Sequence, residues 1–128
     1  MNIAEASGRS GVPPRTIRFY EQIGLIAPRR AGNGYRDFSE ADAARLALIG
    51  RARNLGFGVE DCRSLLALQE DAHRASADVK RLARERLASI DAKIRDLKEM
   101  RGSLAALLDT CRGDDGADCG ILEGLSGG

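Results

Sequence analysis

Residues 76–119 read SADVKRLARERLASIDAKIRDLKEMRGSLAALLDTCRGDDGADC and contain the longest regular pattern of the chain. From residue 83 onward, positions at alternating spacings of four and three residues are apolar in every case but one. A 3.5-residue repeat sustained over this length predicts a helix that packs in a left-handed coiled coil. The series comprises Ala83, Leu87, Ile90, Ile94, Leu97, Arg101, Leu104, Leu108 and Cys111.

We expect this helix to start with Ser76 as its N-cap and to run to Cys111, a length of roughly 50 Å. Its apolar stripe is narrow, and the rest of the chain has no second long helix that could cover it. The same helix of a second copy is the simplest partner. The pattern therefore predicts a two-fold homodimer.

Directly after this helix, Cys111 and Cys119 flank a seven-residue loop rich in glycine and aspartate. Gly113 and Gly116 permit positive φ, and the aspartates favour turns, so the loop can bring both thiols to one ion. No histidine or further cysteine follows. Two soft thiolates suit a monovalent d¹⁰ ion better than Zn²⁺, which usually takes four ligands. The alternative is a pair of ordinary thiols in a flexible tail.

The N-terminal segment predicts two short helices separated by a tight turn. The first covers residues 2–10 with Asn2 as N-cap, and the second covers residues 14–23 and ends at Gly24. Helix, short glycine-containing turn and helix are typical of a helix-turn-helix. The second helix is expected to direct polar side chains outward to bases and phosphates, namely Arg15, Thr16, Arg18 and Tyr20. Ile17 is expected at the packed edge of this helix, and Tyr20 is a second candidate for that edge.

A basic hairpin is expected next. Strands at 25–27 and 34–38 would flank a tip that includes Asn33-Gly34, which is a strong hairpin signal. Such a hairpin after a helix-turn-helix is a wing, and Tyr35 and Arg36 would contact the DNA backbone. The alternative is a mobile surface hairpin.

Two further helices complete this part of the chain. Ser39 is expected to cap the first of them, which runs to about Arg53, with Asp42 closing a capping box. The second is expected from about Val59 to Leu68. Arg53 is a further candidate for a phosphate contact. The organisation we expect is a winged helix-turn-helix domain at 1–68, a linker at 69–75, a dimerisation helix at 76–111, and a metal-binding loop with a short last helix at 112–128.

Charge is unevenly distributed although the net charge is only +1. The segment from Arg9 to Arg36 contains six arginines and only one acidic residue, Glu21. This excess of positive charge indicates a phosphate-binding surface. Three cysteines without a secretory leader, and no apolar run long enough for a membrane span, favour a cytoplasmic protein. His73 is the only histidine and no nucleophile–base set accompanies it, so an enzyme is not expected. We expect Cys62 to be a packing residue.

Several short motifs together resemble the MerR family of regulators, and its copper-responsive CueR/HmrR branch in particular. The resemblance covers nearly the whole chain. Its motifs are IRFYE at 17–21, GLI at 24–26, NGYR at 33–36, ARNLGF at 52–57, SADVK at 76–80, and the loop from Cys111 through Gly113-Asp114-Asp115 to Asp118-Cys119.

The resemblance implies a mainly α fold, with a winged helix-turn-helix, a long dimerisation helix in an antiparallel coiled coil, and a C-terminal metal loop. It implies a homodimer that stays on double-stranded promoter DNA. Metal binding would bend and untwist the DNA so that RNA polymerase can use the promoter. Cu⁺, or Ag⁺ or Au⁺, would be the ion held by Cys111 and Cys119.

Ser76 is the expected selectivity residue. Members of the family that sense divalent ions usually carry cysteine here, contributed to the partner's metal loop, so serine would favour two-coordinate ions. Proline near the loop cysteines is common in copper members, whereas Arg112 and Gly120 stand here. Three alternatives remain at this stage: a thiol redox sensor using the same two cysteines, a regulator of a divalent metal, and a copper carrier without regulatory function.

Overall fold

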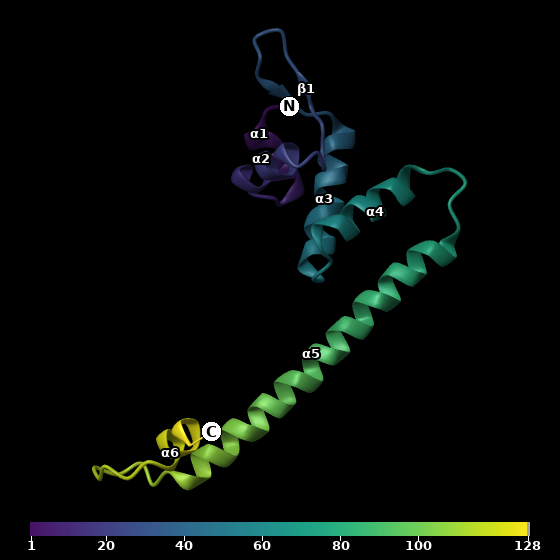
Figure 1. Cartoon of the computed structure of the whole chain (residues 1–128). Coiled ribbons are helices and arrows are strands. Elements are labelled where there is room, and N and C mark those ends of the chain that lie inside the picture. Colours follow the sequence, from purple (N-terminus) through teal and green to yellow (C-terminus); the bar gives the residue numbers. More distant parts are fainter. Residues whose placement is uncertain (128) are drawn as a thin grey trace. The chain divides into compact units, whose positions relative to one another are not determined.

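The computed structural model describes residues 1–127, which are mainly helical, as expected, and contain one two-stranded sheet (Figure 1). By contacts the chain divides into two compact units, Met1–Ala83 and Arg84–Gly128. The elements are α1 (Ile3–Ser10), α2 (Pro14–Gln22), β1 (Arg29–Arg30), β2 (Arg36–Asp37), α3 (Glu40–Asn54), α4 (Val59–Glu70), α5 (Ser76–Thr110) and α6 (Gly120–Ser126).

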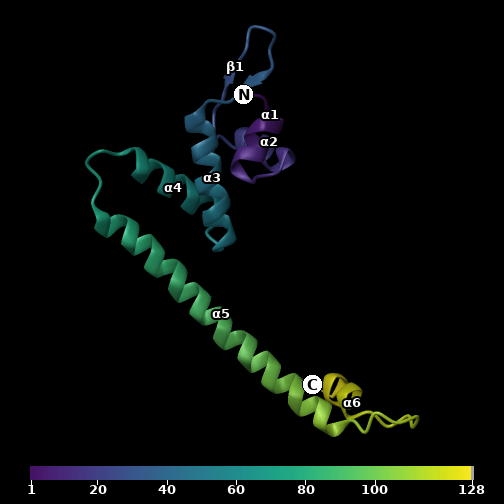
Figure 2. The same cartoon turned by 180° about the vertical axis from the view of Figure 1, so that it is seen from behind.

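The first unit is built on a helix-turn-helix whose ends are set by local chemistry. The Asn2 side chain accepts a hydrogen bond from the Glu5 backbone N–H at 2.8 Å, which caps α1 as predicted. Gly11, with φ of 77°, ends α1 in the left-handed conformation, and Pro14 opens α2. α3 lies against α1 in both views, and α1 also packs against α2 (Figure 2). The core joins Ala6, Val12, Ile17, Tyr20, Leu25, Ile26, Phe38, Leu46, Ile49, Ala52, Phe57, Cys62 and Leu66.

The capping box expected at the start of α3 is confirmed. The Asp42 backbone N–H donates to Ser39 Oγ at 3.0 Å, and the Ser39 N–H donates to Asp42 Oδ2 at 2.8 Å. Further along, a Cβ on Gly50 would lie 3.2 Å from Val12 Cγ2, so glycine lets α3 approach the turn between α1 and α2 closely.

The hairpin is confirmed, but its first strand is not where the sequence predicted it. Residues 25–27 form no strand, because the N–H groups of Leu25 and Ile26 donate to the Tyr20 carbonyl of α2, at 2.8 and 3.4 Å, while their side chains are buried in the core. Pairing occurs instead between Arg29–Arg30 and Arg36–Asp37, in antiparallel register. Gly34 has φ of 84° and its N–H donates to the Ala31 carbonyl at 2.9 Å, which closes the turn.

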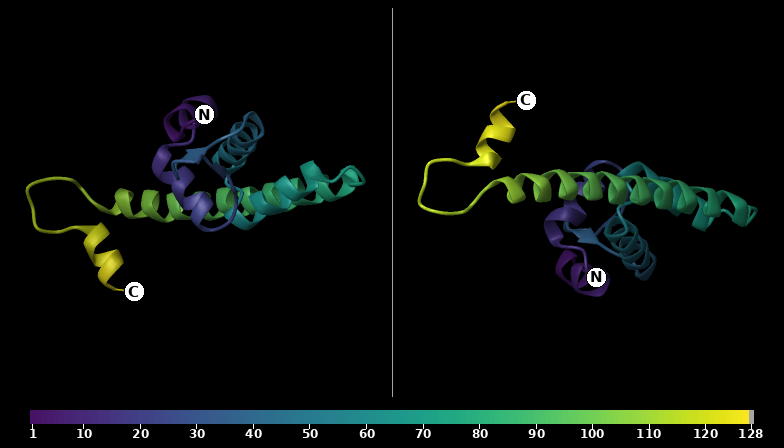
Figure 3. Two further views of the ribbon diagram at one scale, coloured as in Figure 1. Left: turned by 90° about the horizontal axis from the view of Figure 1, so that it is seen from above. Right: turned by 90° about the horizontal axis from the view of Figure 1, so that it is seen from below.

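One predicted helix cap differs from the structure. Ser76 is the first residue of α5 and not the residue before it, and at the start of α6 the N-cap position is occupied by Cys119. α5 runs without a break to Thr110, and a loop then leads to α6 (Figure 3). None of the helices in residues 1–127 combines the length and the hydropathy that a bilayer crossing needs.

The apolar repeat of α5 is largely uncovered in the single chain. Leu87, Leu97, Leu104 and Leu108 are each between 55% and 61% exposed. Large apolar side chains in a regular row on one face of a helix mark a surface that another molecule covers.

Candidate metal centre and DNA interface

Cys111 and Cys119 come together at the end of α5, as the spacing predicted. Their Sγ atoms are 3.7 Å apart, and both residues are half-buried. Two metal–thiolate bonds of about 2.3 Å each exceed half this separation, so one ion can contact both sulfurs. The donor set fits a soft ion with few ligands. Among residues 1–127, no group of three or more cysteine, histidine or carboxylate side chains gathers in a way that could hold a metal.

The start of α6 surrounds Cys119 with hydrogen-bond donors. The backbone N–H of Leu122 lowers the pKa of the Cys119 thiol, and the Cys111 thiol and the N–H of Ile121 act in the same direction. A thiolate is the form that binds metal, so this environment favours metal binding by Cys119.

Short interactions shape the loop between the thiols. Gly113 has φ of 66°, and Asp114 Oδ1 accepts a hydrogen bond from the Gly116 N–H at 2.9 Å. Arg112 lies 3.5 Å from an Asp114 oxygen and 3.8 Å from an Asp118 oxygen. The loop aspartates whose contacts are known therefore form turns and ion pairs.

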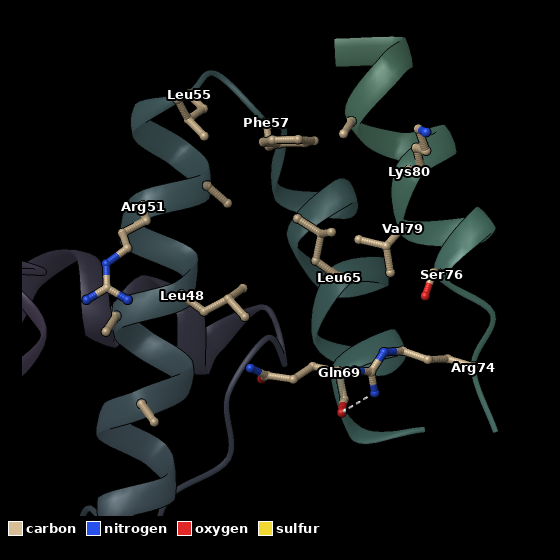
Figure 4. Close-up of a pocket in the computed structure, with 14 residues that line it drawn as sticks. Leu48, Arg51, Leu55, Phe57, Leu65, Gln69, Arg74, Ser76, Val79 and Lys80 are labelled. Carbon is tan, nitrogen blue, oxygen red and sulfur yellow. Dashed lines mark hydrogen bonds between the residues drawn. The ribbon is translucent and has the colours of Figure 1, made fainter. Parts of the chain in front are cut away.

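Ser76 lies at an apolar groove within the first unit, together with side chains of α3, α4 and the start of α5 (Figure 4). The groove has a volume of about 1040 Å³. Leu48, Leu65 and Val79 point into the space between these helices, and the Ser76 hydroxyl lies at its margin. Ser76 is therefore on a face that a second molecule can reach.

On α2, the predicted DNA-facing residues separate into two groups. Arg15 and Arg18 are exposed and Thr16 is half-exposed, and within residues 1–127 neither arginine side chain has a hydrogen bond or ion pair. Tyr20 is only 5% exposed and belongs to the core, so of its two expected placements the packed edge of α2 is correct and the outward one is wrong. Its ring follows Ile17 on the inner face of α2, because residues three apart share one helix face.

In the hairpin, Tyr35 is 74% exposed, as a surface contact requires. Arg36 is only partly available, because its Nε donates to Glu21 Oε1 at 2.7 Å and ties β2 to α2. Arg30 reaches the same oxygen at 3.4 Å. Glu21 thus fixes the wing beside the helix whose arginines are exposed.

Two further arginines of the first unit connect neighbouring segments by donating hydrogen bonds to backbone carbonyls. Arg53 is exposed, and its Nη1 donates to the Phe57 carbonyl at 2.9 Å across the turn from α3 to α4. Arg63, which the sequence did not single out, donates from α4 to the carbonyls of Ile23 and Gly24 at 3.0 and 3.1 Å. A cation at the C-terminal end of α2 matches the helix dipole. No sequence pattern indicated this contact, because the partners are about 40 residues apart in the chain.

Two protein-family models together match most of this chain. A model described as MerR HTH family regulatory protein covers residues 1–69, and one described as MerR, DNA binding covers residues 43–107. This chain belongs to the MerR family of transcriptional regulators. The fold and the resemblance expected from the sequence are thereby confirmed, and the matched regulators are transcription factors and not enzymes.

Two transcriptional regulators are similar to this chain over nearly their whole length, which supports the assignment. The chain is 57% identical over 128 residues to the HTH-type transcriptional regulator HmrR of Rhizobium leguminosarum bv. viciae, covering 100% of this chain and 99% of that protein. It is 43% identical to the HTH-type transcriptional regulator CueR of Salmonella typhimurium, covering 99% of this chain and 93% of CueR.

Solved structures of MerR-family members superpose on the whole chain. The regulator PbrR691 from Ralstonia metallidurans CH34 in complex with lead(II) has a TM-score of 0.85 at 28% identity, with 98% of each chain covered. The regulator MerR from Bacillus megaterium MB1 in complex with mercury(II) has a TM-score of 0.74 at 32% identity, covering 98% of this chain and 99% of that one.

The three cysteines should differ in reactivity because their surroundings differ. Cys62 is fully buried, and burial raises the pKa of its thiol, whereas that of Cys119 is lowered. At pH 7 the reduced, metal-free protein should therefore be alkylated by iodoacetamide at Cys119 at least about tenfold faster than at Cys62. Mass spectrometry of peptides after timed labelling measures both rates. Denaturant should remove the difference, and equal rates in the native protein would contradict this assignment.

Proposed function

We propose that this MerR-family regulator is a homodimer that senses a monovalent soft metal ion, Cu⁺ first and Ag⁺ or Au⁺ by the same chemistry, and activates a metal-detoxification promoter. The observation that carries the proposal is the 3.7 Å separation of the Cys111 and Cys119 sulfurs. In this proposal the chain comprises a DNA-binding domain at 1–68, a linker at 69–75, a dimerisation helix at 76–111 and a metal loop at 112–128.

The chemistry of the thiol pair supports a monovalent ion. Cys111 and Cys119 would hold it as two thiolates, and a bound ion would fix the loop to the end of α5. The N–H groups of Ile121 and Leu122 that lower the pKa of Cys119 also favour the negative charge left on a bis-thiolate with a +1 ion. In a reducing compartment both thiols stay available for metal.

Ser76 is the proposed selectivity residue. Its hydroxyl is a harder and weaker donor than a thiolate, so a partner subunit that supplies Ser76 would add no third sulfur ligand. The structure of PbrR691 contains lead(II) and that of the Bacillus megaterium MerR contains mercury(II), so proteins of this fold also bind divalent ions. Selectivity must therefore come from the ligands and not from the fold.

Dimerisation through α5 is supported by the exposed apolar row that includes Leu87, Leu97 and Leu104. Burying a leucine side chain contributes about 1.5–3 kcal/mol, so covering this row gives a stable association. An antiparallel arrangement would bring the thiol end of one α5 toward the Ser76 end of the partner's α5.

The DNA contacts follow from the exposed surface of the first unit. Arg15, Thr16 and Arg18 of α2 are proposed to reach base edges and phosphates, and Tyr35 and Arg36 of the wing to contact the backbone. Arg53 and the Tyr20 hydroxyl remain weaker candidates, because the first is engaged with Phe57 and the second belongs to a core side chain. Metal-induced distortion of the operator would then realign the promoter for RNA polymerase.

A thiol redox sensor is the second candidate, favoured by the same 3.7 Å separation, since the sulfurs need little movement to form a disulfide. Titration with Cu⁺ under reducing conditions discriminates, because a redox sensor would show no tight stoichiometric binding. A regulator of a divalent ion is tested by a Zn²⁺ control. A copper carrier would not need the exposed arginines of α2, and gel shifts with promoter DNA test it.

Removal of the Arg18 charge should weaken binding to all DNA sequences. Arg18→Ala loses one phosphate contact, so the slope of log affinity against log salt should fall by about 1. Fluorescence anisotropy with operator and unrelated duplexes at several salt concentrations measures this. Arg95→Ala in α5 removes the same charge outside the DNA-binding domain and should leave the slope unchanged. An unchanged slope for Arg18→Ala would remove it from the interface.

Replacement of either loop thiol should abolish metal-dependent activation. Cys111→Ser and Cys119→Ser each leave one thiolate, while Cys62→Ser removes a cysteine outside the site and should keep the response if the variant folds. In vitro transcription from the cognate promoter against buffered free Cu⁺, with Zn²⁺ as a control, tests the function. Activation that survives loss of either loop thiol would refute the proposal.

A sulfur ligand at position 76 should broaden the metal response. Ser76→Cys supplies a third thiolate, which divalent ions such as Zn²⁺ and Hg²⁺ use, so the reporter should respond to them. Ser76→Ala is the matched control and should keep the preference for Cu⁺. A Ser76→Cys protein still blind to divalent ions would show that selectivity lies elsewhere.

A further inference from the structure

The apolar row of α5 has the same spacing in both directions. From Ala83 to Leu108 its members are separated by four, three, four, three, four, three and four residues. Two copies of the row therefore match when they run in opposite directions about a centre between residues 95 and 96. The pairs that meet across the two subunits are Ala83 with Leu108, Leu87 with Leu104, Ile90 with Arg101, and Ile94 with Leu97.

Three charged side chains lie in or beside this row. Arg101 stands in the row itself, and Asp91 and Lys98 each directly follow one of its members. Asp91 and Lys98 are seven residues apart, which is about two helical turns, so they lie on the same flank of the row. All three residues are exposed, and within residues 1–127 none of their side chains takes part in a hydrogen bond or an ion pair. Their charges are therefore available to another molecule.

The reversed match brings these charges together across the two subunits. The position opposite Asp91 is residue 100 of the partner, so the partner's Lys98 and the partner's Arg101 lie about 3 Å and about 1.5 Å from it along the helix axis. A two-fold axis perpendicular to both helices places the same flank of each helix side by side. One acid of each subunit then meets two bases of the other, and the arrangement occurs twice in each dimer.

We propose that Asp91 of each subunit pairs with Lys98 and Arg101 of the partner subunit, and that these two ion clusters fix the antiparallel direction and the register of the dimer. The inference rests on the proposed homodimer and names the residues that decide how its subunits align. A reversed second copy of this chain fits the exposed row because it supplies both the matching apolar spacing and the opposite charges. The register also decides which residues of one subunit lie beside the metal loop of the other.

Other alignments of two α5 helices bring like charges together. A parallel pair places Arg101 against the partner's Arg101 inside the apolar row. An antiparallel pair shifted by one heptad places Asp91 against the partner's Asp91, and a shift in the opposite direction places Lys98 against the partner's Lys98. Like charges at these positions oppose association, so the charge pattern favours one alignment over its nearest alternatives.

A zero-length cross-link tests the contact directly in the full-length, reduced, metal-free protein. A carbodiimide joins a carboxylate to an amine as an amide and takes up the lost water as its urea. Asp91 and Lys98 of one helix are about 10.5 Å apart along the axis, so a link between them is expected from the partner subunit. Unlabelled and ¹⁵N-labelled chains are equilibrated together before the reaction, and mass spectrometry should find the link in peptide pairs of mixed isotopes. Asp96, on the outer face of α5, should give no link between subunits.

Exchange of charges tests whether the clusters select the partner. One chain carries Asp91→Arg and the other carries Lys98→Asp/Arg101→Asp, so each homodimer brings like charges together and the mixed dimer restores opposite charges. After the two full-length chains are equilibrated, native mass spectrometry should find about 90% mixed dimers, compared with about 50% for random association. Asp96→Arg and Arg95→Asp are the matched pair on the outer face of α5, and they should mix at random.

A combined variant tests the direction of the helices. Asp91→Arg alone should raise the dissociation constant of the dimer at least about tenfold in sedimentation experiments. The Asp91→Arg/Lys98→Asp/Arg101→Asp chain restores opposite charges within an antiparallel homodimer and should return to within about threefold of the parent protein. Circular dichroism checks that α5 stays helical, and the recovery in the combined variant can be measured even if Asp91→Arg alone does not fold.

The outcomes separate this inference from the function on which it rests. A dimeric protein that gives no link between Asp91 and Lys98 and whose charge-exchanged chains mix at random would overturn the ion clusters and leave the homodimer standing. A monomeric parent protein would overturn both. Metal sensing is tested independently, because every measurement here uses the metal-free protein.

Discussion

The apolar row along α5 is the constraint on which this molecule depends. A helix of 35 residues has one narrow hydrophobic face, and in the single chain Leu87, Leu97, Leu104 and Leu108 remain more than half exposed. Exposure of such an apolar row to water is unfavourable in free energy. The first unit has a hydrophobic core of its own, formed by other residues. A second copy is the proposed cover. Dimerisation then gives two DNA-binding units and two thiol pairs from one repeating pattern.

Within the first unit, charged side chains hold in place the elements that carry the arginines proposed to bind DNA. Glu21 joins α2 to the wing through Arg36, and Arg63 joins the end of α2 to α4. Each of these residues has a partner inside the protein, so less of its side chain is available to DNA. The side chains of Arg15 and Arg18 are exposed and stay fully available. The basic segment therefore has two kinds of arginine, and composition alone does not distinguish them.

At the other end of the chain, the candidate metal centre combines soft donors with close packing. Cys111 directly follows the last residue of α5 and Cys119 directly precedes the first residue of α6, so the separation of the sulfurs depends on how α6 lies on α5. The site is thus defined by backbone contacts around the thiols as much as by the thiols themselves, which agrees with the importance of surrounding residues in metal sites generally.

Local and periodic signals in the sequence determined much of this protein: the helix-turn-helix, the Ser39 capping box, the long helix and the pairing of the loop thiols. These features depend on neighbouring residues or on a regular repeat. Tertiary structure alone decided that residues 25–26 enter the core and form no strand, that Tyr20 faces inward, and that Arg63 holds α2. The physical reason is that each of these outcomes depends on what a distant or facing segment leaves available, either a carbonyl group or a place in the core, and sequence spacing carries no record of that.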